Sequence, residues 1–208
     1  MLFTNRTTVP MPLLAPTSAD AFVARLAQSP CCAAIVADPQ LDIALGSAAP
    51  VIFTLRGNGL EISTTVRRVH DAGKLIAVHL DLVDGLRADH AGVVWLARLG
   101  VDAIITSHGQ LMSPIRSEGA VAIQRLLLSR RSHLDTAVAA IGRSKPDIVE
   151  VLPGVILPSI RHRLPSFGVP LLAGGFVRTR ADVQALLAAG AVGVTTSTPE
   201  LWFDNDGD

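Results

Sequence analysis

The chain has 208 residues, of which 49% are hydrophobic, and its 18 basic and 18 acidic side chains give no net charge at pH 7. This length and apolar content are typical of one domain with a substantial core, and the balanced charge excludes a general attraction to nucleic acids or membranes. Two adjacent cysteines, Cys31 and Cys32, form neither an unstrained disulfide nor a complete zinc site, so we expect reduced thiols in a cytoplasmic protein.

No apolar run reaches the length of a membrane-spanning helix, so the sequence predicts no membrane partner. The first ten residues are polar and lack the layout of a signal peptide. We therefore divide the chain into a flexible lead-in (residues 1–16), one domain (17–203) and an acidic tail (204–208).

Apolar runs and helical patterns alternate along the domain. Thr17 or Ser18 can cap a first helix that ends near Gln28 and either closes the bottom of a barrel or packs beside it. Buried strands are predicted at 33–37, 51–55, 74–80, 103–106, 120–126 and 147–152, and in two later runs that end at Gly174–Gly175 and Thr195–Ser197. Helices are predicted at 60–72, 89–99, 132–142, 157–167 and 180–189, with a weakly helical crossover at 40–49 and a short helix within 109–117.

The unit of strand, loop and helix thus repeats about eight times, and continuous apolar runs indicate strands buried on both faces. These features predict an α/β fold, a single (β/α)8 TIM-barrel-like domain. An open doubly wound sheet is the alternative, but its glycine-rich phosphate loop usually follows the first strand, whereas here it follows the seventh. At this length some crossovers are short, and we expect the one after the first strand to be among them.

Two neighbouring loops near the end of the chain favour anion binding. Gly174 and Gly175 allow a close backbone approach, and the next loop carries Thr196 and Ser197 before a short helix. In a (β/α)8 barrel a phosphate-binding cup lies after strands 7 and 8. We call these four residues the phosphate cup; the simpler interpretation is that the glycines only turn the chain.

Further polar residues are expected at the mouth, where the strands end. Arg125 interrupts an apolar strand and needs a partner, for which Glu150 on the next strand is the candidate. The pair either ties two strands together or faces a bound anion or polyol. His79 and Asp81 are expected to share one strand face, where with Glu150 they are candidates for metal binding or acid–base chemistry.

Lysine chemistry and nucleic-acid contacts can be judged from position. Lys74 and Lys145 both precede strands, which places them at the bottom of the barrel and excludes a Schiff base at the mouth. The basic residues that follow strands, and are candidates for RNA phosphates or simply for a solvated face, are Arg116, Arg130, Arg131, Arg178 and Arg180.

Six segments together resemble the glycerol uptake operon antiterminator regulatory proteins, the GlpP family. The matching segments are Val78–Leu86, Ile104–Ser107, Ala122–Leu126, Lys145–Gly154, Ala173–Thr179 and Gly190–Trp202. The chain differs from the family pattern after the fourth strand, where Ser107-His108 stands in place of basic residues.

The resemblance implies a TIM-barrel-like protein without established enzymatic activity or cofactor, which senses glycerol-3-phosphate and binds leader mRNA of glycerol-utilisation genes to prevent early termination. The ligand phosphate would lie in the phosphate cup, and we infer that the glycerol hydroxyls meet some of His79, Asp81, Arg125 and Glu150. Two alternatives stay open: an enzyme acting on a small phosphorylated substrate, and a sensor that acts through a protein partner. The sequence leaves a homo-oligomer open as well.

Overall fold

The structure is a computed structural model, and it describes residues 17–36, 38–130, 133–164 and 168–203. The predicted lead-in (1–16), the predicted tail (204–208) and Arg131 lie outside the described residues. Among the described residues, no helix combines the length and the apolar character needed to cross a lipid bilayer.

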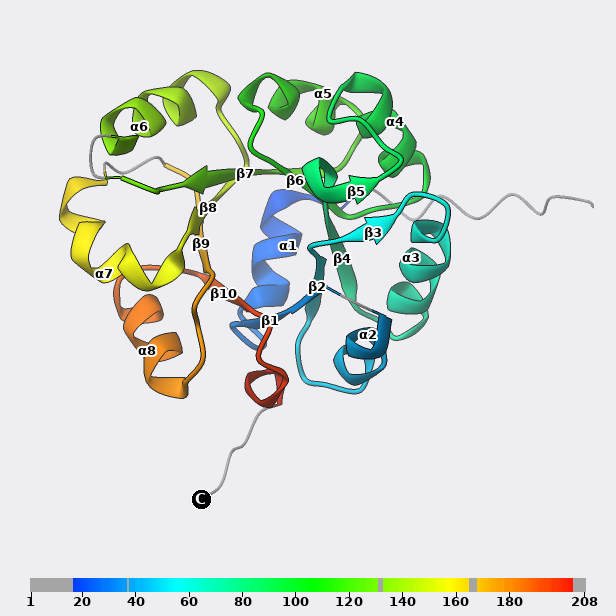
Figure 1. Cartoon of the computed structure of the whole chain (residues 1–208), viewed down its shortest axis with the longest axis horizontal. Coiled ribbons are helices and arrows are strands. Elements are labelled where there is room, and N and C mark those ends of the chain that lie inside the picture. Colours follow the sequence, from blue (N-terminus) through cyan, green and yellow to red (C-terminus); the bar gives the residue numbers. More distant parts are fainter. Residues whose placement is uncertain (1–16, 37, 131–132, 165–167, 204–208) are drawn as a thin grey trace, which may run out of the picture.

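Eight parallel strands close into a barrel, in the order β1-β10-β9-β8-β7-β6-β4-β2 (Figure 1). The strands are β1 (Cys31–Ile35), β2 (Val51–Thr54), β4 (Leu75–His79), β6 (Ala103–Thr106), β7 (Val121–Leu127), β8 (Ile148–Leu152), β9 (Leu171–Gly174) and β10 (Gly193–Thr196). The pairing of β1 with both β2 and β10 closes the sheet. The predicted TIM-barrel-like fold is therefore confirmed, and the open sheet is not formed.

Helices cover the outside of the barrel (Figure 1). They are α2 (Asp38–Leu45), α3 (Ile62–Asp71), α4 (His90–Arg98), α5 (Met112–Ser117), α6 (His133–Ser144), α7 (Leu157–Ile160) and α8 (Arg180–Ala188), with a 3-10 turn at Pro199–Trp202 after β10. The crossover helix after the first strand, α2, is among the shorter ones with 8 residues, as expected, but α5 with 6 and α7 with 4 are shorter still. Pro114 and Pro158 stand in the first turns of α5 and α7, where the missing N–H costs no helical hydrogen bond.

The first helix, α1 (Ala19–Leu26), closes the bottom of the barrel, which was one of the two placements predicted (Figure 1). Its Phe22 and Leu26 are fully buried against residues that point into the barrel, and the Phe22 ring meets the Phe53 ring edge-on at 6.5 Å between centroids. Ser18 is the N-cap, because its hydroxyl accepts a hydrogen bond from the Ala21 amide. The barrel interior is thus packed at one end, and the opposite end is the mouth.

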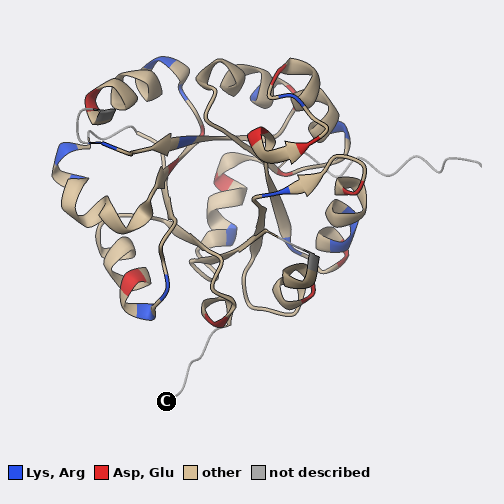
Figure 2. Ribbon diagram, viewed as in Figure 1, with Lys and Arg blue, Asp and Glu red and all other residues tan. Residues whose placement is uncertain are grey.

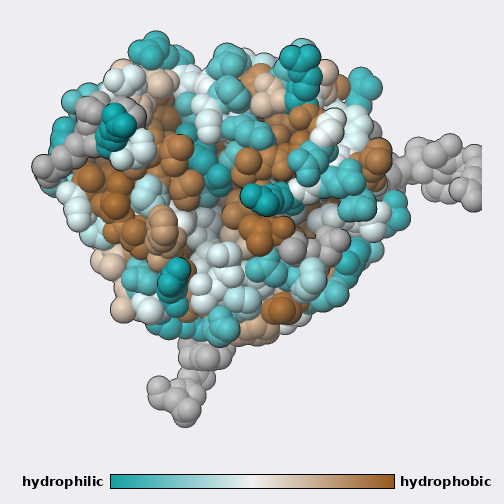
Figure 3. Space-filling model, viewed as in Figure 1, coloured by the Kyte–Doolittle hydropathy of each residue, from teal (hydrophilic) through white to brown (hydrophobic). Residues whose placement is uncertain are grey.

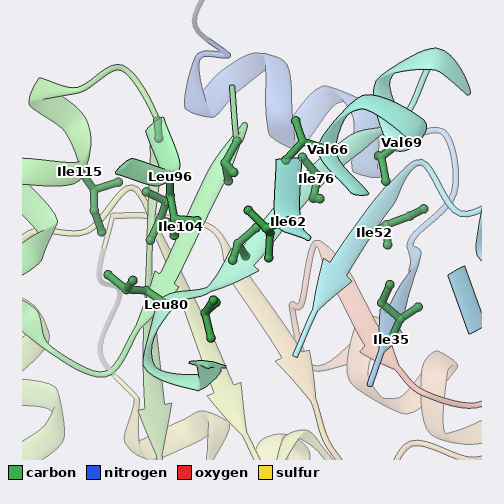
Figure 4. Packing of buried hydrophobic residues seen from close by; sticks show 14 of the residues in the cluster. Ile35, Ile52, Ile62, Val66, Val69, Ile76, Leu80, Leu96, Ile104 and Ile115 are labelled. Carbon is green, nitrogen blue, oxygen red and sulfur yellow. The ribbon is translucent and has the colours of Figure 1, made fainter. Parts of the chain in front are cut away.

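A second apolar layer fills the space between the strands and the surrounding helices. Figure 4 shows Ile52 and Ile76 from the strands packed near Ile62 and Val66 of α3. Because strand residues alternate between the barrel interior and this outer layer, neighbouring residues on one strand face different environments. This alternation decides which polar groups reach the mouth.

One element was not predicted. Gly57–Asn58 (β3) and Val83–Asp84 (β5) pair as a short two-stranded parallel ribbon beyond the ends of β2 and β4 (Figure 1). Gly57 is close-packed there, since an added Cβ would lie 3.0 Å from the Ile62 Cδ1 atom. Strands of two residues carry no periodicity, which is why the sequence pattern did not reveal them.

Candidate functional site

The polar centre of the mouth is an ion pair that faces into the barrel. Arg125 Nε donates to Glu150 Oε2 at 2.8 Å, and the two residues are register partners on β7 and β8. The Arg125 side chain is 10% exposed and the Glu150 side chain 1%. Thr195 donates from Oγ1 to the other carboxylate oxygen, Glu150 Oε1, at 3.0 Å. The predicted pairing of Arg125 with Glu150 is confirmed, and Thr195 completes it.

Gly174 lies next to these side chains, and its role there is to leave room for them rather than to bind a ligand. A Cβ at this position would lie 2.0 Å from Thr195 Oγ1 and 3.2 Å from Glu150 Oε1. The absence of a side chain therefore lets Thr195 reach Glu150. The next residues, Gly175 and Phe176, both have positive φ angles, 85° and 61°. Gly175 turns the chain there, and a Cβ on it would meet Leu152 Cδ1 at 2.7 Å.

The hydroxyl of Thr196 faces away from the barrel interior. It donates to the Val177 carbonyl at 2.9 Å and accepts from the Thr198 amide at 3.1 Å, so it ties the loop after β9 to the loop after β10. Ser197 is exposed at the rim. Thr195, which the sequence prediction did not include, is the threonine that points inward; period-2 alternation from Gly193 was the signal that could have identified it.

The start of α8 is occupied by its own chain. The Asp182 carboxylate accepts hydrogen bonds from the amides of Arg178 and Thr179, and the Thr179 hydroxyl completes a capping box. These bonds, first the one from the Arg178 amide, lower the pKa of Asp182. The two amides are therefore not available to a ligand phosphate.

A cavity of about 300 Å³ opens between these loops, and we call it the mouth cavity. Its lining residues are Ala34, Leu55, Arg125, Glu150, Leu152, Gly175, Phe176, Val177, Arg178, Thr195, Thr196, Ser197 and Thr198. Five of the eight predicted ligand-binding residues thus line one cavity, whereas His79, Asp81 and Gly174 are not among the lining residues. Two arginines face one carboxylate in the lining, and this balance favours an anion.

Apolar side chains surround the mouth. Figure 3 shows them gathered on the face drawn there, and the exposed ones at strand ends or in the segments that follow strands include Leu60, Leu82, Leu127, Val155 and Phe176. Phe176, which is 72% exposed, also lines the mouth cavity. An apolar wall beside Arg125 and Arg178 reduces solvent screening and strengthens their attraction for an anion.

His79 is buried at the end of β4, and neither ring nitrogen has a hydrogen-bond partner among the described residues. The pKa of His79 is lowered from the usual 6.5 to about 4, chiefly by burial and then by the Arg125 charge, against the opposing effect of Asp81 and Glu150. The ring is neutral at pH 7, so one nitrogen can donate and the other can accept a hydrogen bond.

Asp81 does not share a strand face with His79, and that prediction is wrong. The strand ends at His79, and Leu80–Leu82 form a 3-10 turn. The Asp81 carboxylate accepts hydrogen bonds from the Thr106 hydroxyl and from the Ser107 amide. It therefore fixes the loop after β6. Among the described residues, no group of three His, Cys, Asp or Glu side chains is arranged to hold a metal ion.

The candidate RNA-binding arginines fall on different parts of the surface. Arg178 is exposed and lines the mouth cavity, and Arg130 is exposed in the loop after β7. Arg180 donates to the Phe203 carbonyl, and Arg116 donates to the Lys145 carbonyl at the bottom end of the barrel. Figure 2 shows basic residues on separate elements around the barrel rather than in one patch. Arg116 therefore does not share a surface with the mouth.

The two lysines are at the bottom of the barrel, as predicted. Lys74 Nζ donates to the Ser47 and Ala49 carbonyls just before β2, and Lys145 precedes β8. A Schiff-base mechanism at the mouth is thus excluded by position. Cys31 and Cys32 are buried in β1 and form no disulfide, and burial raises the pKa of Cys32.

Comparison with known protein families identifies the family of this chain. The sequence profile of the glycerol-3-phosphate responsive antiterminators matches residues 31–202, which is all of the barrel from β1 to the turn after β10. The chain belongs to this family. The resemblance seen in the six sequence segments is therefore confirmed.

Individual proteins are also similar to this chain. YgcP, an uncharacterized protein of Escherichia coli K12, is 29% identical over 85% of this chain and 93% of its own length. The solved glycerol uptake operon antiterminator regulatory protein of Listeria monocytogenes is 28% identical, with a TM-score of 0.79 over 84% of this chain and 95% of that chain. An antiterminator-related protein of Thermotoga maritima, 24% identical over 83% of this chain and 96% of that chain, shares the fold with a TM-score of 0.74.

Proposed function

We propose that this protein is a cytoplasmic regulator, not an enzyme, that binds glycerol-3-phosphate in the mouth cavity and controls the binding of leader mRNA. One observation carries the proposal: a cavity of about 300 Å³ at the barrel mouth, lined by two arginines and one carboxylate, in a chain of the glycerol-3-phosphate responsive antiterminator family. This volume is at the lower end of the roughly 300–1,000 Å³ of small-molecule sites, which suits a three-carbon ligand.

The ligand phosphate is assigned to the side of the cavity formed by Arg178, Gly175 and Ser197. Arg178 offers a charged donor, Ser197 a hydroxyl, and the glycine permits a close backbone approach. The glycerol end is assigned to the floor, near Arg125 and Glu150. Because the Glu150 carboxylate already accepts from Arg125 and Thr195, its role is to hold Arg125 in place as much as to bind a hydroxyl.

Arg178 provides the connection between ligand and RNA. It lines the cavity, and it is exposed at the rim together with Arg130 and Arg180. A ligand phosphate that pairs with Arg178 changes the charge and the loop conformation presented to an RNA backbone. A ligand shifts such an equilibrium only by its different affinity for the two states, so glycerol-3-phosphate and RNA must change each other's affinity by the same factor.

The first test is thermal melting with glycerol-3-phosphate, inorganic phosphate and glycerol. A ligand that binds only the folded state raises the melting temperature, and we expect the rise to be specific to glycerol-3-phosphate. Arg178→Gln should remove most of the rise, whereas Arg116→Gln, which changes another exposed arginine at the bottom, should leave it unchanged. A rise produced equally by phosphate alone would show a generic anion site and contradict the proposal.

RNA binding is tested separately with labelled leader RNA over a range of salt concentrations. Each lost phosphate contact lowers the slope of log affinity against log salt by roughly 0.7–0.9, so Arg178→Gln should lower it by about one contact and Arg116→Gln by none. Glycerol-3-phosphate binding without any salt-dependent RNA affinity would instead favour a sensor that acts through a protein partner.

A second candidate function rests on His79. A buried imidazole that is neutral at pH 7 and has two unpartnered nitrogens is suited to proton transfer. In that case the protein would be an enzyme, and its phosphorylated ligand would extend beyond the lining of the mouth cavity to reach His79. Phosphorus NMR of glycerol-3-phosphate incubated with the protein distinguishes the two: the regulator leaves the ligand unchanged, and a new signal that disappears in His79→Gln would indicate turnover.

A further inference from the structure

A second and larger cavity, of about 480 Å³, lies outside the barrel wall at the ends of β1 and β2. We call it the side cavity. Ile35 and Thr54 line the side cavity, whereas their chain neighbours Ala34 and Leu55 line the mouth cavity. Because strand side chains alternate between faces, the two cavities lie on opposite sides of the same two strands and share no lining residue. The function proposed for the mouth leaves the side cavity without a role.

Thr54 marks the side cavity as a place where a polar partner is missing. The residue is 3% exposed, and its hydroxyl has no hydrogen-bond partner among the described residues. Buried polar groups are nearly always hydrogen-bonded, and valine would fit a strand equally well without this cost. Thr54 thus leaves an unsatisfied hydroxyl in the wall of the side cavity, covered in this conformation, and a rotation of its side chain would present that hydroxyl to an occupant.

The walls of the side cavity are built from parts with separate chemistry. Ile35, Leu41 and Ile62, each at most 5% exposed, give an apolar side. The ribbon of β3 and β5 forms another wall, where the Gly59 amide donates to the Asp84 carbonyl at 2.9 Å and holds the ribbon closed. An occupant therefore has an apolar part that packs on the isoleucines and a polar part that reaches the ribbon.

Charge sets the class of the occupant. The charged residues of the lining are Arg56, Glu61 and Asp84, and no ion pair joins Arg56 to either carboxylate within the described residues. Two carboxylates against one guanidinium disfavour a simple anion such as phosphate, in contrast to the mouth cavity. Opposite charges that line one cavity without pairing are complementary to a molecule that carries both an ammonium and a carboxylate group.

We propose that the side cavity is a second ligand site, which binds a small zwitterion of the α-amino acid class with an apolar side chain. Its carboxylate pairs with Arg56, its ammonium group faces Glu61 and Asp84, and one of its polar atoms hydrogen-bonds the Thr54 hydroxyl. The apolar side chain packs against Ile35, Leu41 and Ile62. This site does not depend on what binds at the mouth.

The test uses the whole chain with methyl-labelled isoleucine and leucine, titrated with the standard L-amino acids and followed by NMR. At least one apolar amino acid should shift the methyl signals of Ile35 and Ile62, while Ile123, inside the barrel, stays unchanged. The matched amine and the matched carboxylate of that amino acid should bind more weakly than the zwitterion. The proposal would be overturned if the matched carboxylate bound as tightly as the amino acid, if only methyl signals at the mouth shifted, or if no amino acid shifted any methyl signal.

Variants sharpen this result. Thr54→Val should weaken the binding of that amino acid about 5–10-fold, the effect of one hydrogen bond, and Arg56→Gln about tenfold. Ser197→Ala, at the rim of the mouth cavity, is the matched control and should leave this affinity unchanged. Thr54→Val also tests the hydroxyl directly: without any ligand it should raise the melting temperature by about 2–4 °C. A lower melting temperature would mean that Thr54 has a partner in the folded chain, and the proposal would fail.

Discussion

The two sides of the barrel mouth treat their buried polar side chains in different ways. On the side of β7 to β10, the Glu150 carboxylate is bound by Arg125 and Thr195, and the Thr196 hydroxyl is bound by the next loop. On the side of β2 and β4, Thr54 and His79 are each 3% exposed and lack hydrogen-bond partners among the described residues. The first side is complete within the chain, and the second is not.

This difference separates polar groups that stabilise the fold from polar groups that still lack a hydrogen-bond partner. An unpartnered buried donor or acceptor costs about 1–3 kcal/mol, which a fold selected only for stability would remove by substitution. The satisfied pair of Arg125 and Glu150 therefore builds the mouth and holds one arginine at a cavity. The unpartnered groups, His79 inside the barrel wall and Thr54 outside it, are the positions at which a hydrogen-bond partner would add most stability.

The largest expected effect comes from breaking the satisfied side. Arg125→Ala leaves the Glu150 carboxylate, with its side chain 1% exposed, charged and without its cation. Removing one partner of a buried pair costs about 3–5 kcal/mol, so urea unfolding should show a loss of this size. The same variant should lower the affinity for glycerol-3-phosphate at least tenfold by calorimetry.

Two further variants serve as controls for Arg125→Ala. Arg116→Ala removes an exposed arginine and should change stability by less than about 0.5 kcal/mol. Arg125→Met combined with Glu150→Gln removes both charges while keeping an acceptor for Thr195, so it should recover most of the stability but not the affinity. A loss below about 1 kcal/mol in Arg125→Ala would contradict the view that the pair holds the mouth together.

The unpartnered side has a pH signature. The pKa of His79 is about 4 in the folded protein and 6.5 when unperturbed. Between these values the unfolded chain binds a proton that the folded protein does not, so stability falls as the pH falls. From pH 7.5 to pH 5 we expect His79 to contribute a loss of about 2 kcal/mol.

Urea unfolding at both pH values, for wild type and for His79→Leu, isolates this contribution from that of other groups. The variant should lose less stability on acidification than the wild type does, by about 2 kcal/mol. Equal pH dependence in the two proteins would show that His79 titrates normally in the fold. It would then have solvent or a partner that satisfies its ring nitrogens.

The fold could be predicted from the sequence because its signals are local and repeated. Continuous apolar runs, each followed by a helical pattern and a glycine, identify buried parallel strands, and the repetition identifies a barrel. The ribbon of β3 and β5 could not be predicted in this way, because two-residue strands have no periodicity. The ends of strands were also less certain: His79 and Asp81 are two residues apart, but the 3-10 turn at Leu80–Leu82 separates their directions.

The candidate site was predictable where one residue contradicted its surroundings. An arginine within an apolar strand requires a partner, and Arg125 and Glu150 follow from that requirement alone. Residue types in the phosphate cup were less informative, because the chain uses them itself: Gly174 makes room for Thr195, and the Thr196 hydroxyl ties two loops. Which of the two adjacent threonines points inward follows from the period-2 alternation that starts at Gly193, but the sequence pattern does not fix the residue at which this strand begins.

The most direct test of the difference between the two sides is one substitution made at two threonines. Thr195 and Thr54 are 4% and 3% exposed, and both are strand residues whose replacement by valine conserves shape. Thr195→Val removes a hydrogen bond to a charged carboxylate and should cost about 1.5–3 kcal/mol. Thr54→Val removes an unpartnered hydroxyl and should stabilise the protein by about 1 kcal/mol. Opposite signs in urea unfolding would establish that one side of the mouth is satisfied within the chain and the other is not. Equal losses would mean that the Thr54 hydroxyl has a hydrogen-bond partner in solution. His79 would then be the remaining unpartnered group on that side.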